Sequence, residues 1–225
     1  MPIPLEISPG ARSILDAAAE VFATASFDSV SVADIAARAN VSKANVFHHF
    51  ASKEALYLEV MREACKGHAE FTEALIDEDT ASAEKLRRLI AFDFEDLFGN
   101  EQRSQLVLRE VLNTGSRSGR NLVGPVFQRN FVAVTAVIRQ GQKRGEFRRA
   151  FDPAVAAWML GASVMMFFQN RGIMGQLPGF ENARSPAEYA DKVFETLLNG
   201  LSAVGRAAKS RSVRAAVRKK KSDTQ

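Results

Sequence analysis

The sequence contains few of the residues that build disulfides, metal centres or membrane spans. Its 225 residues include one cysteine, Cys65, which excludes an internal disulfide and a cysteine-based zinc site and agrees with a reducing compartment. No apolar run reaches the roughly 18 to 20 residues that cross a bilayer. The N-terminus MPIPLEISPG also lacks the basic and apolar regions of a secretory signal. We therefore expect a cytoplasmic protein with no membrane partner.

Catalytic signatures are missing as well. The sequence has no glycine-rich phosphate loop, no HExxH pair and no nucleophile elbow. His48 and His49 are adjacent, and neighbouring residues on a helix point about 100° apart, so these two rings cannot easily converge on one ion. The sequence therefore predicts a binding protein that is not an enzyme and uses neither a cofactor nor a metal.

Positive charge is concentrated at the C-terminal end. The net charge is +4, but residues 206–225 hold eight cationic side chains and only one acidic one, Asp223, so the rest of the chain is slightly acidic. This tail is either a disordered solvating extension or a source of non-specific DNA affinity through counterion release. Because the excess positive charge lies in this tail, the net charge alone does not indicate a nucleic-acid partner. That inference depends on the local arrangement of residues in the rest of the chain.

The sequence is rich in residues that mark the starts of helices. Ser, Asp or Asn repeatedly precedes an apolar run of helical period, where its side chain can accept hydrogen bonds from free backbone N–H groups. Sustained alternation of β-branched residues is absent, so the fold class is all-α with about nine helices. Helices are expected to start near Ser8-Pro9, Ser31, Ser42, Ser52, Ser82, Asn100, Leu122, Asp152-Pro153 and Ser185-Pro186.

Two short helices are expected between Ser31 and Phe50, separated by Asn40-Val41. Asparagine tolerates the left-handed backbone conformation that lets two helices meet at a steep angle. The apolar residues of both helices would pack against the first helix, whose stripe includes Ile14, Ala18 and Phe22. These residues predict a compact trihelical unit containing a helix-turn-helix.

The run SVADIAARANVSKANVFHHFASKEAL, from Ser31 to Leu56, resembles the DNA-binding segment of the TetR/AcrR family of transcriptional regulators, and ILDAAAEVFATASFDSVS upstream resembles its first helix and turn. The resemblance covers about the first quarter of the chain. It implies a DNA-binding domain over residues 8–68, a C-terminal domain for ligand binding and dimerisation over residues 69–205, and the basic tail over 206–225.

The resemblance also implies which residues meet DNA. Ser42 would cap the recognition helix and present its N-terminal end to the major groove, while Ser31 and Lys53 would hold phosphates. Two departures from the family pattern are Asn40 for glycine at the corner and Phe47 for tyrosine. The predicted DNA-binding residues are Ser31, Ser42, Lys43, Ala44, Asn45, Phe47, His48, His49 and Lys53. Residues 1–53 carry four cationic and five acidic side chains, so their net charge does not attract DNA. Affinity for DNA must come from a few specific contacts, and a dimer makes each of them twice.

For the C-terminal domain, the resemblance implies a homodimer and a cavity for a small molecule. The predicted ligand-binding residues are Asp93, Phe94, Phe98, Glu110, Asn113, Phe127, Asn130 and Phe131. The predicted dimer interface mixes bulky and small side chains, which permits close helix approach. Its residues are Trp158, Gly161, Ala162, Met165, Val193, Leu197 and Leu201.

The resulting hypothesis is a dimeric repressor that binds a pseudo-palindromic double-stranded operator and is released by an apolar or amphipathic ligand, because that ligand binds a state with more widely spaced recognition helices. Two alternatives stay open from the sequence. One is a DNA-binding or architectural factor that responds to no ligand, and the other is a ligand-dependent activator.

Overall fold

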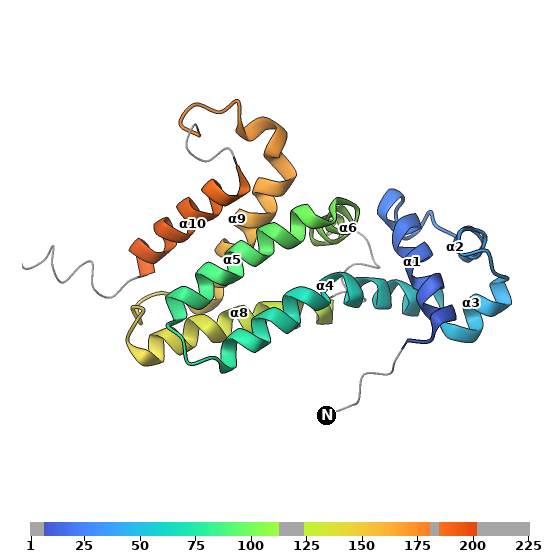
Figure 1. Cartoon of the computed structure of the whole chain (residues 1–225), viewed down its shortest axis with the longest axis horizontal. Coiled ribbons are helices and arrows are strands. Elements are labelled where there is room, and N and C mark those ends of the chain that lie inside the picture. The colour runs from blue at the N-terminus through green and yellow to red at the C-terminus, as the bar shows by residue number, and fades with distance from the viewer. Residues whose placement is uncertain (1–6, 113–123, 181–184, 202–225) are drawn as a thin grey trace, which may run out of the picture. The chain divides into compact units, whose positions relative to one another are not determined.

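The structure is a computed structural model that describes residues 7–112, 124–180 and 185–201 (Figure 1). This part of the chain is helical and contains no strand. The helices are α1 (Pro9–Thr24), α2 (Val32–Arg38), α3 (Lys43–His49), α4 (Lys53–Asp77), α5 (Ser82–Gly99), α6 (Glu101–Leu112), α8 (Gly124–Arg144), α9 (Pro153–Met174) and α10 (Pro186–Leu201). None of the helices in these ranges combines the length and the apolar run that crossing a bilayer requires.

The predicted fold class is confirmed, and the predicted caps position most of the helix starts. Ser8 accepts a hydrogen bond from the Ala11 N–H, and Asp152 caps α9 with Pro153 in the first turn. Asn100 accepts from Arg103 N–H at the start of α6. The start expected near Leu122 lies outside the described residues, and α8 is described from Gly124. The capping side chains act within one turn, which is why the sequence reveals them.

The chain divides into two compact units. One takes the described residues within Met1–Phe71 and Glu95–Asn130, and the other takes those within Thr72–Phe94 and Phe131–Gln225. This division differs from the predicted boundary at residue 68, because α6 and the start of α8 belong with the first three helices. Arg109 of α6 donates to the carbonyls of Phe22 and Ala23 at the end of α1. Those two carbonyls are among the last of α1 and have no partner within the helix.

The first unit has an apolar core built from α1, α2, α3, α4 and α6. Phe22 and Tyr57 meet edge to face with ring centroids 4.7 Å apart, and Phe27 packs against both rings. Leu106 of α6 is 1% exposed in the same core. Burial of this kind contributes about 1.5–3 kcal/mol for each large side chain, so the core holds the short helices α2 and α3 in place.

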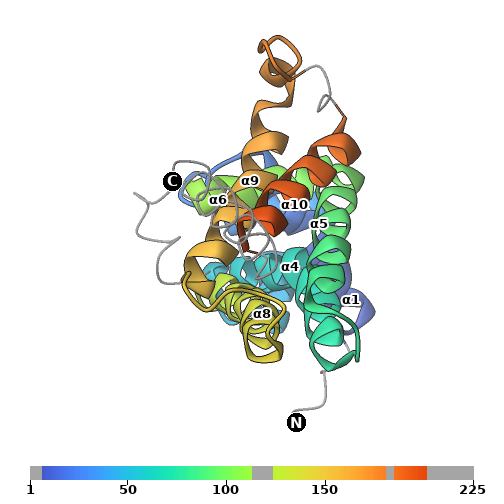
Figure 2. The same cartoon turned by 90° about the vertical axis from the view of Figure 1, so that its left-hand side faces the viewer.

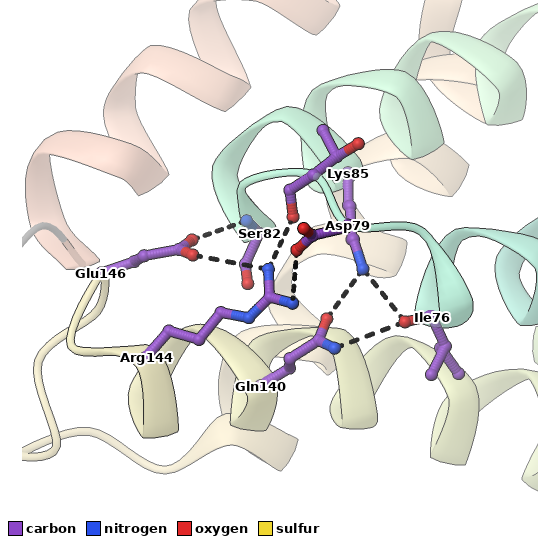
Figure 3. Close-up of polar contacts among 8 residues, drawn as sticks. Ile76, Asp79, Ser82, Lys85, Gln140, Arg144 and Glu146 are labelled. Carbon is purple, nitrogen blue, oxygen red and sulfur yellow. Dashed lines mark hydrogen bonds and ion pairs between the residues drawn. The ribbon is translucent and has the colours of Figure 1, made fainter.

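The second unit contains a fully buried lysine. Lys85 of α5 donates from Nζ to the Ile76 carbonyl at 3.0 Å, near the end of α4, and to Gln140 Oε1 of α8 at 2.9 Å (Figure 3). Glu146 caps α5 by accepting from the Ser82 N–H at 2.6 Å. Burial lowers the pKa of Lys85. This network joins the α4–α5 turn to the C-terminal end of α8.

Close backbone approach also holds this part of the second unit together. A Cβ on Gly141 of α8 would lie 2.4 Å from Phe147 Cδ2 and 2.9 Å from Ser82 Cβ. Phe147 is 2% exposed and follows the turn at Gly145, whose φ is +77°. The absence of a side chain at position 141 therefore lets the ring of Phe147 lie against α8.

Helix α9 is apolar on nearly all sides. Leu160, Val164, Phe167 and Phe168 face the core of the second unit. The opposite face carries Val155, Met159, Met166 and Ile173, all more than half exposed. Figure 2 shows the end of α9 and the following turn reaching beyond α10. A helix that is apolar all round belongs in an interior, so its exposed face marks an interaction surface.

Candidate nucleic-acid interface

The corner between α2 and α3 has the geometry that the sequence predicts. Asn40 has φ +54°, a left-handed conformation. The Val41 N–H donates to the Ala36 carbonyl at 2.9 Å, and the Asn40 N–H donates to the Ala37 carbonyl at 3.2 Å. These two bonds form a Schellman motif, which satisfies the free carbonyls at the end of α2 and turns the chain sharply into α3.

Helix α3 presents a polar face and buries an apolar one. Val46 is 1% exposed and anchors the helix in the core, with Phe50 half-buried beside it. Ser42 caps the helix by accepting from the Asn45 N–H at 3.1 Å. On the outer side, Phe47 is half exposed, and the side chains of Lys43, Ala44, Asn45 and His48 are also exposed. The first turn thus offers an ammonium, an amide and an apolar ring to one external surface.

The two histidines at the end of α3 differ in placement. Their rings meet edge to face, with centroids 5.0 Å apart. His48 is exposed, whereas His49 is half-buried with Nε2 next to Gly10 at the start of α1. Within the described residues there is no group of three metal-ligating side chains that would use them. His48 is therefore the more available of the two for a surface partner.

Two predicted phosphate-binding residues make internal contacts. Ser31 forms a capping box with Asp34, whose carboxylate accepts from the Ser31 N–H at 2.9 Å and from its hydroxyl at 2.6 Å. The hydrogen bond from the Ser31 hydroxyl lowers the pKa of Asp34. Lys53 donates from Nζ to the carbonyls of Phe27 at 2.6 Å and Val30 at 2.7 Å. Both residues thus hold the loop before α2, and a phosphate contact would have to share these atoms.

We call residues 7–53, which contain α1, α2 and α3, the head, and its net charge is low, as the sequence indicates. Arg38 pairs with Glu20, and Arg12 pairs with Glu63 at 2.9 Å, so two of its cations are already neutralised by acids. Lys43 carries no such ion pair among the described contacts, and it stands in the first turn of α3, where backbone N–H groups add partial positive charge. The N-terminal end of α3 is therefore the part of the head best suited to contact the anionic backbone of a nucleic acid.

The predicted ligand-binding residues are divided between the two units. Phe98, Glu110, Phe127 and Asn130 fall in the first unit, and Asp93, Phe94 and Phe131 in the second, while Asn113 lies outside the described residues. Phe94 is core, packed edge to face against Phe167 and Tyr189. Glu110 Oε2 and Asn130 Oδ1 are both buried; Asn130 Oδ1 has no hydrogen-bond partner in the described part of the chain, whereas the Glu110 carboxylate lies against the Tyr57 hydroxyl. These two atoms keep the polar character that an anchor needs, and the ligand assignment stays a prediction.

A small apolar cavity lies within the second unit, and none of the predicted ligand-binding residues lines it. Its volume is about 10 Å³, roughly the space of one water molecule. Helices α5, α8, α9 and α10 enclose it. The lining residues are Leu86, Ile90, Ile138, Phe147, Ala156, Leu160, Phe194, Leu197 and Leu198. Leu197, predicted at the dimer interface, thus points at least partly into its own unit.

The other predicted interface residues are only partly on the surface. Trp158 is 65% exposed, whereas Gly161, Ala162, Met165 and Val193 are half-buried. The side chain of Leu201 lies outside the described residues. The exposed face of α9 also includes Val155, Met159, Met166 and Ile173, which are not among the predicted interface residues. An α-helix that is apolar all round gives no periodic signal to show which side is outward.

Comparison with known proteins supports both the all-helical fold and the helix-turn-helix of the head. Residues 14–60 match the profile described as bacterial regulatory proteins of the tetR family. Residues 83–192 match the tetracyclin repressor-like C-terminal domain. The A-factor receptor protein of Streptomyces griseus is 31% identical over 160 residues, which are 68% of this chain and 51% of that protein. The chain thus spans about half the length of this relative.

Solved structures share the fold at lower identity. The transcriptional regulator FadR from Bacillus subtilis, in complex with stearoyl-CoA, superimposes with a TM-score of 0.71 at 21% identity, covering 84% of this chain and 98% of that one. AibR, in complex with isovaleryl coenzyme A and operator DNA, has a TM-score of 0.62 at 19% identity and covers 83% and 97%. Identities this low show a common fold.

The fold and the capped, outward-facing α3 define a helix-turn-helix regulatory protein with a second helical domain. With both halves of the chain matched, the chain belongs to the TetR family of bacterial regulatory proteins. The family assignment made from residues 31–56 is confirmed.

Proposed function

We propose that this regulator is a dimeric repressor that reads a pseudo-palindromic operator with α3 and leaves it when an acyl-CoA thioester binds. The main observation behind the proposal is that α3 has one buried side and one exposed side. One side is anchored by the buried Val46, and the other presents Lys43, Asn45 and Phe47. Lys43 would contact a phosphate, Asn45 a phosphate or an adenine edge, and Phe47 a sugar or a thymine methyl.

Dimerisation supplies the DNA affinity that a single head lacks. A single α3 offers few cations, so it neutralises few phosphates and binds weakly. Two copies joined through the C-terminal units would place two recognition helices about 34–36 Å apart, one turn of B-DNA. The exposed apolar face of α9, with Trp158 and Met166, supports this assembly.

The test of the head begins with selection of bound duplexes from a random pool, which yields the operator and its symmetry. Fluorescence anisotropy on that operator then compares the wild-type protein with the Lys43→Ala and Asn45→Ala variants. Each base or phosphate contact contributes about 1–3 kcal/mol, so the double variant loses at least about 30-fold in affinity.

The matched control is Lys66→Ala, which removes an exposed cation from α4 outside the head. It leaves operator affinity within about twofold, because charges beyond a Debye length from DNA are screened. Unchanged binding by the double variant, or a monomeric wild-type protein, would remove the basis of the proposal.

The ligand class rests on similarity and on the apolar interior. The FadR structure holds stearoyl-CoA and the AibR structure holds isovaleryl coenzyme A. In this chain the cavity inside the second unit is about 10 Å³, too small for an acyl chain. To occupy this cavity, a ligand of this class needs a state in which the surrounding helices have moved apart. By population shift, it lowers DNA affinity through its preference for that state.

Titration of the protein–operator complex tests the ligand class. Stearoyl-CoA or isovaleryl-CoA is expected to weaken operator binding at least tenfold, while free coenzyme A has no effect. Equal effects of the thioesters and of coenzyme A would show that the acyl chain is not recognised.

A second candidate is a DNA-binding factor that responds to no ligand. The small volume of the cavity described in the second unit favours it, because a preformed ligand site is usually a cavity of several hundred Å³. If none of a panel of acyl-CoA thioesters changes the melting temperature or the operator affinity, this candidate replaces the ligand-released repressor. A rise in affinity on ligand addition would instead identify an activator.

A further inference from the structure

Within the head, the donors of Ser31 are bound to a carboxylate of the same chain. Asp34 of α2 accepts hydrogen bonds from the Ser31 N–H at 2.9 Å and from the Ser31 hydroxyl at 2.6 Å, and the Asp34 N–H donates back to the hydroxyl oxygen at 3.2 Å. Both donors with which Ser31 would hold a phosphate are therefore already engaged by an anion.

This carboxylate lies on the outer surface of the head. The side chains of Ser31, Asp34 and Lys43 are all exposed. Hydrogen bonds from Ser31 are the main cause of the lowered pKa of Asp34, and the positive charge of Lys43 adds to the effect. Asp34 is thus ionised at neutral pH and lies near enough to Lys43 to be affected by its charge.

The negative charge of Asp34 is not neutralised by contact with a cation in the part of the chain that the structure describes. Glu20 of the same unit differs in this respect, because it pairs with Arg38. A carboxylate without such a partner repels a DNA backbone and competes with its phosphates for the Ser31 hydroxyl. The charge therefore opposes binding beside two residues that are predicted to bind DNA.

We propose that Asp34 is a negative determinant of DNA affinity, because its carboxylate holds the donors of Ser31 and repels the phosphate that would otherwise bind them. The inference rests on the operator-binding head of the proposed function and adds a residue that weakens contact with the DNA backbone. Backbone contacts carry no sequence information. Weakening them lowers the affinity for any duplex and leaves base contacts a larger share of operator binding.

Position 34 allows a matched pair of variants. Glutamate and glutamine both complete a capping box at the third position of a helix, so Asp34→Glu and Asp34→Gln keep the local fold and differ from each other by one charge. In Asp34→Gln, the side-chain amide oxygen can accept from the Ser31 N–H. The Ser31 hydroxyl is then available to a phosphate.

The test measures binding of the full-length variants to a short duplex of random sequence, by fluorescence anisotropy over a series of salt concentrations. One additional phosphate contact tightens binding about fivefold at about 0.15 M salt and steepens the dependence of log affinity on log salt by about 0.9. Asp34→Gln is therefore expected to bind at least about fivefold more tightly than Asp34→Glu, with the steeper slope. Residues 206–225 are the same in both variants, so the tail does not contribute to the difference. Equal affinities and slopes, or tighter binding by Asp34→Glu, would overturn the proposal.

Two further variants complete the experiment. Asp34→Asn matches aspartate in size and is expected to show the same gain, which covers the case in which the longer glutamine folds poorly. Asp16→Asn removes a carboxylate from an exposed position of α1 and is expected to bind within about twofold of the wild type. An equal gain in Asp16→Asn would assign the effect to net charge and would also overturn the proposal.

These outcomes separate Asp34 from the proposed function. If the Lys43→Ala, Asn45→Ala variant loses operator affinity and the charged and neutral variants at position 34 bind alike, only the inference about Asp34 fails. If the double variant keeps its operator affinity while Asp34→Gln gains affinity, the proposed contacts of α3 fail and the role of Asp34 stands.

Discussion

The ammonium of Lys53 lies 4.2 Å from the centroid of the Phe27 ring and donates a hydrogen bond to the carbonyl of the same residue at 2.6 Å. Lys53 opens α4, whereas Phe27 lies in the loop between α1 and α2. A second bond, to the Val30 carbonyl, reaches the residue just before the α2 cap. One side chain thus ties the loop, the core ring and the linking helix together.

Removing this ammonium is predicted to destabilise the head. Lys53→Met keeps the aliphatic stem but loses two charge-assisted bonds, each worth about 1.5–3 kcal/mol in favourable cases, so we expect a loss of about 2 kcal/mol in urea unfolding. Lys66→Met, at an exposed ion pair of 3.9 Å, is the control and costs about 0–1 kcal/mol. The salt dependence of operator binding should not change for Lys53→Met. A slope lower by about one would show that Lys53 holds a phosphate as well.

The left-handed corner predicts a second stability effect. Asn40 has φ +54°, and a residue with a plain Cβ pays about 1–2 kcal/mol in this region. Asn40→Ala is expected to lose about 1 kcal/mol, while Asn40→Gly is equal to or more stable than the wild type. Both values come from chemical denaturation. Equal stability of the alanine and glycine variants would mean that the corner relaxes to another conformation.

The capping box of α2 predicts a pH dependence. Hydrogen bonds from Ser31 lower the pKa of Asp34 below its ordinary value of 3.8. The folded state therefore gains stability from the ionised carboxylate above about pH 3.8, and this gain is lost as the pH falls below it. The difference in melting temperature between the wild type and Asp34→Asn should stay constant between about pH 6 and 4.5 and shrink below. A difference that is undiminished at about pH 3 would contradict the assignment.

Lys85 predicts a contrast between two substitutions in the second unit. Lys85→Ala removes a fully buried side chain and should cost about 2–5 kcal/mol. Lys85→Met fills the same volume and removes the desolvated charge, so its cost should stay within about 1.5 kcal/mol. Calorimetric melting of both variants checks this. Equal losses for the two variants would mean that the bonds to Ile76 and Gln140, which both variants remove, dominate over packing.

Two glycines should respond in opposite directions. Gly141→Ala places a methyl group 2.4 Å from Phe147 and should cost about 1–3 kcal/mol. Gly161→Ala, in α9, has nothing within 4 Å of the new Cβ and should stabilise the monomer by about 0.5–1 kcal/mol. Urea unfolding measures both. Sedimentation of Gly161→Ala also tests the predicted interface, because a weaker dimer would place Gly161 at a close helix crossing.

Sequence reasoning succeeded where the cause is local. The caps at Ser31, Ser42 and Asp152 and the left-handed Asn40 depend on contacts within one or two turns, so their residue types reveal them. Lys53 could not be assigned in this way. Its partners Phe27 and Val30 precede it by more than twenty positions, and only the packing of α4 against the loop brings them together.

By itself, then, the sequence determined the helices, the helix-turn-helix and the family, because these follow from short-range periodicity, capping and a dense motif. Only the tertiary structure decided that α6 belongs to the first unit, that the cavity among α5, α8, α9 and α10 is only about 10 Å³, and that Ile173 and Leu177 are exposed. The physical reason is that burial depends on which distant helices meet. On an apolar helix such as α9, every side looks equally suited to the core until its neighbours are known.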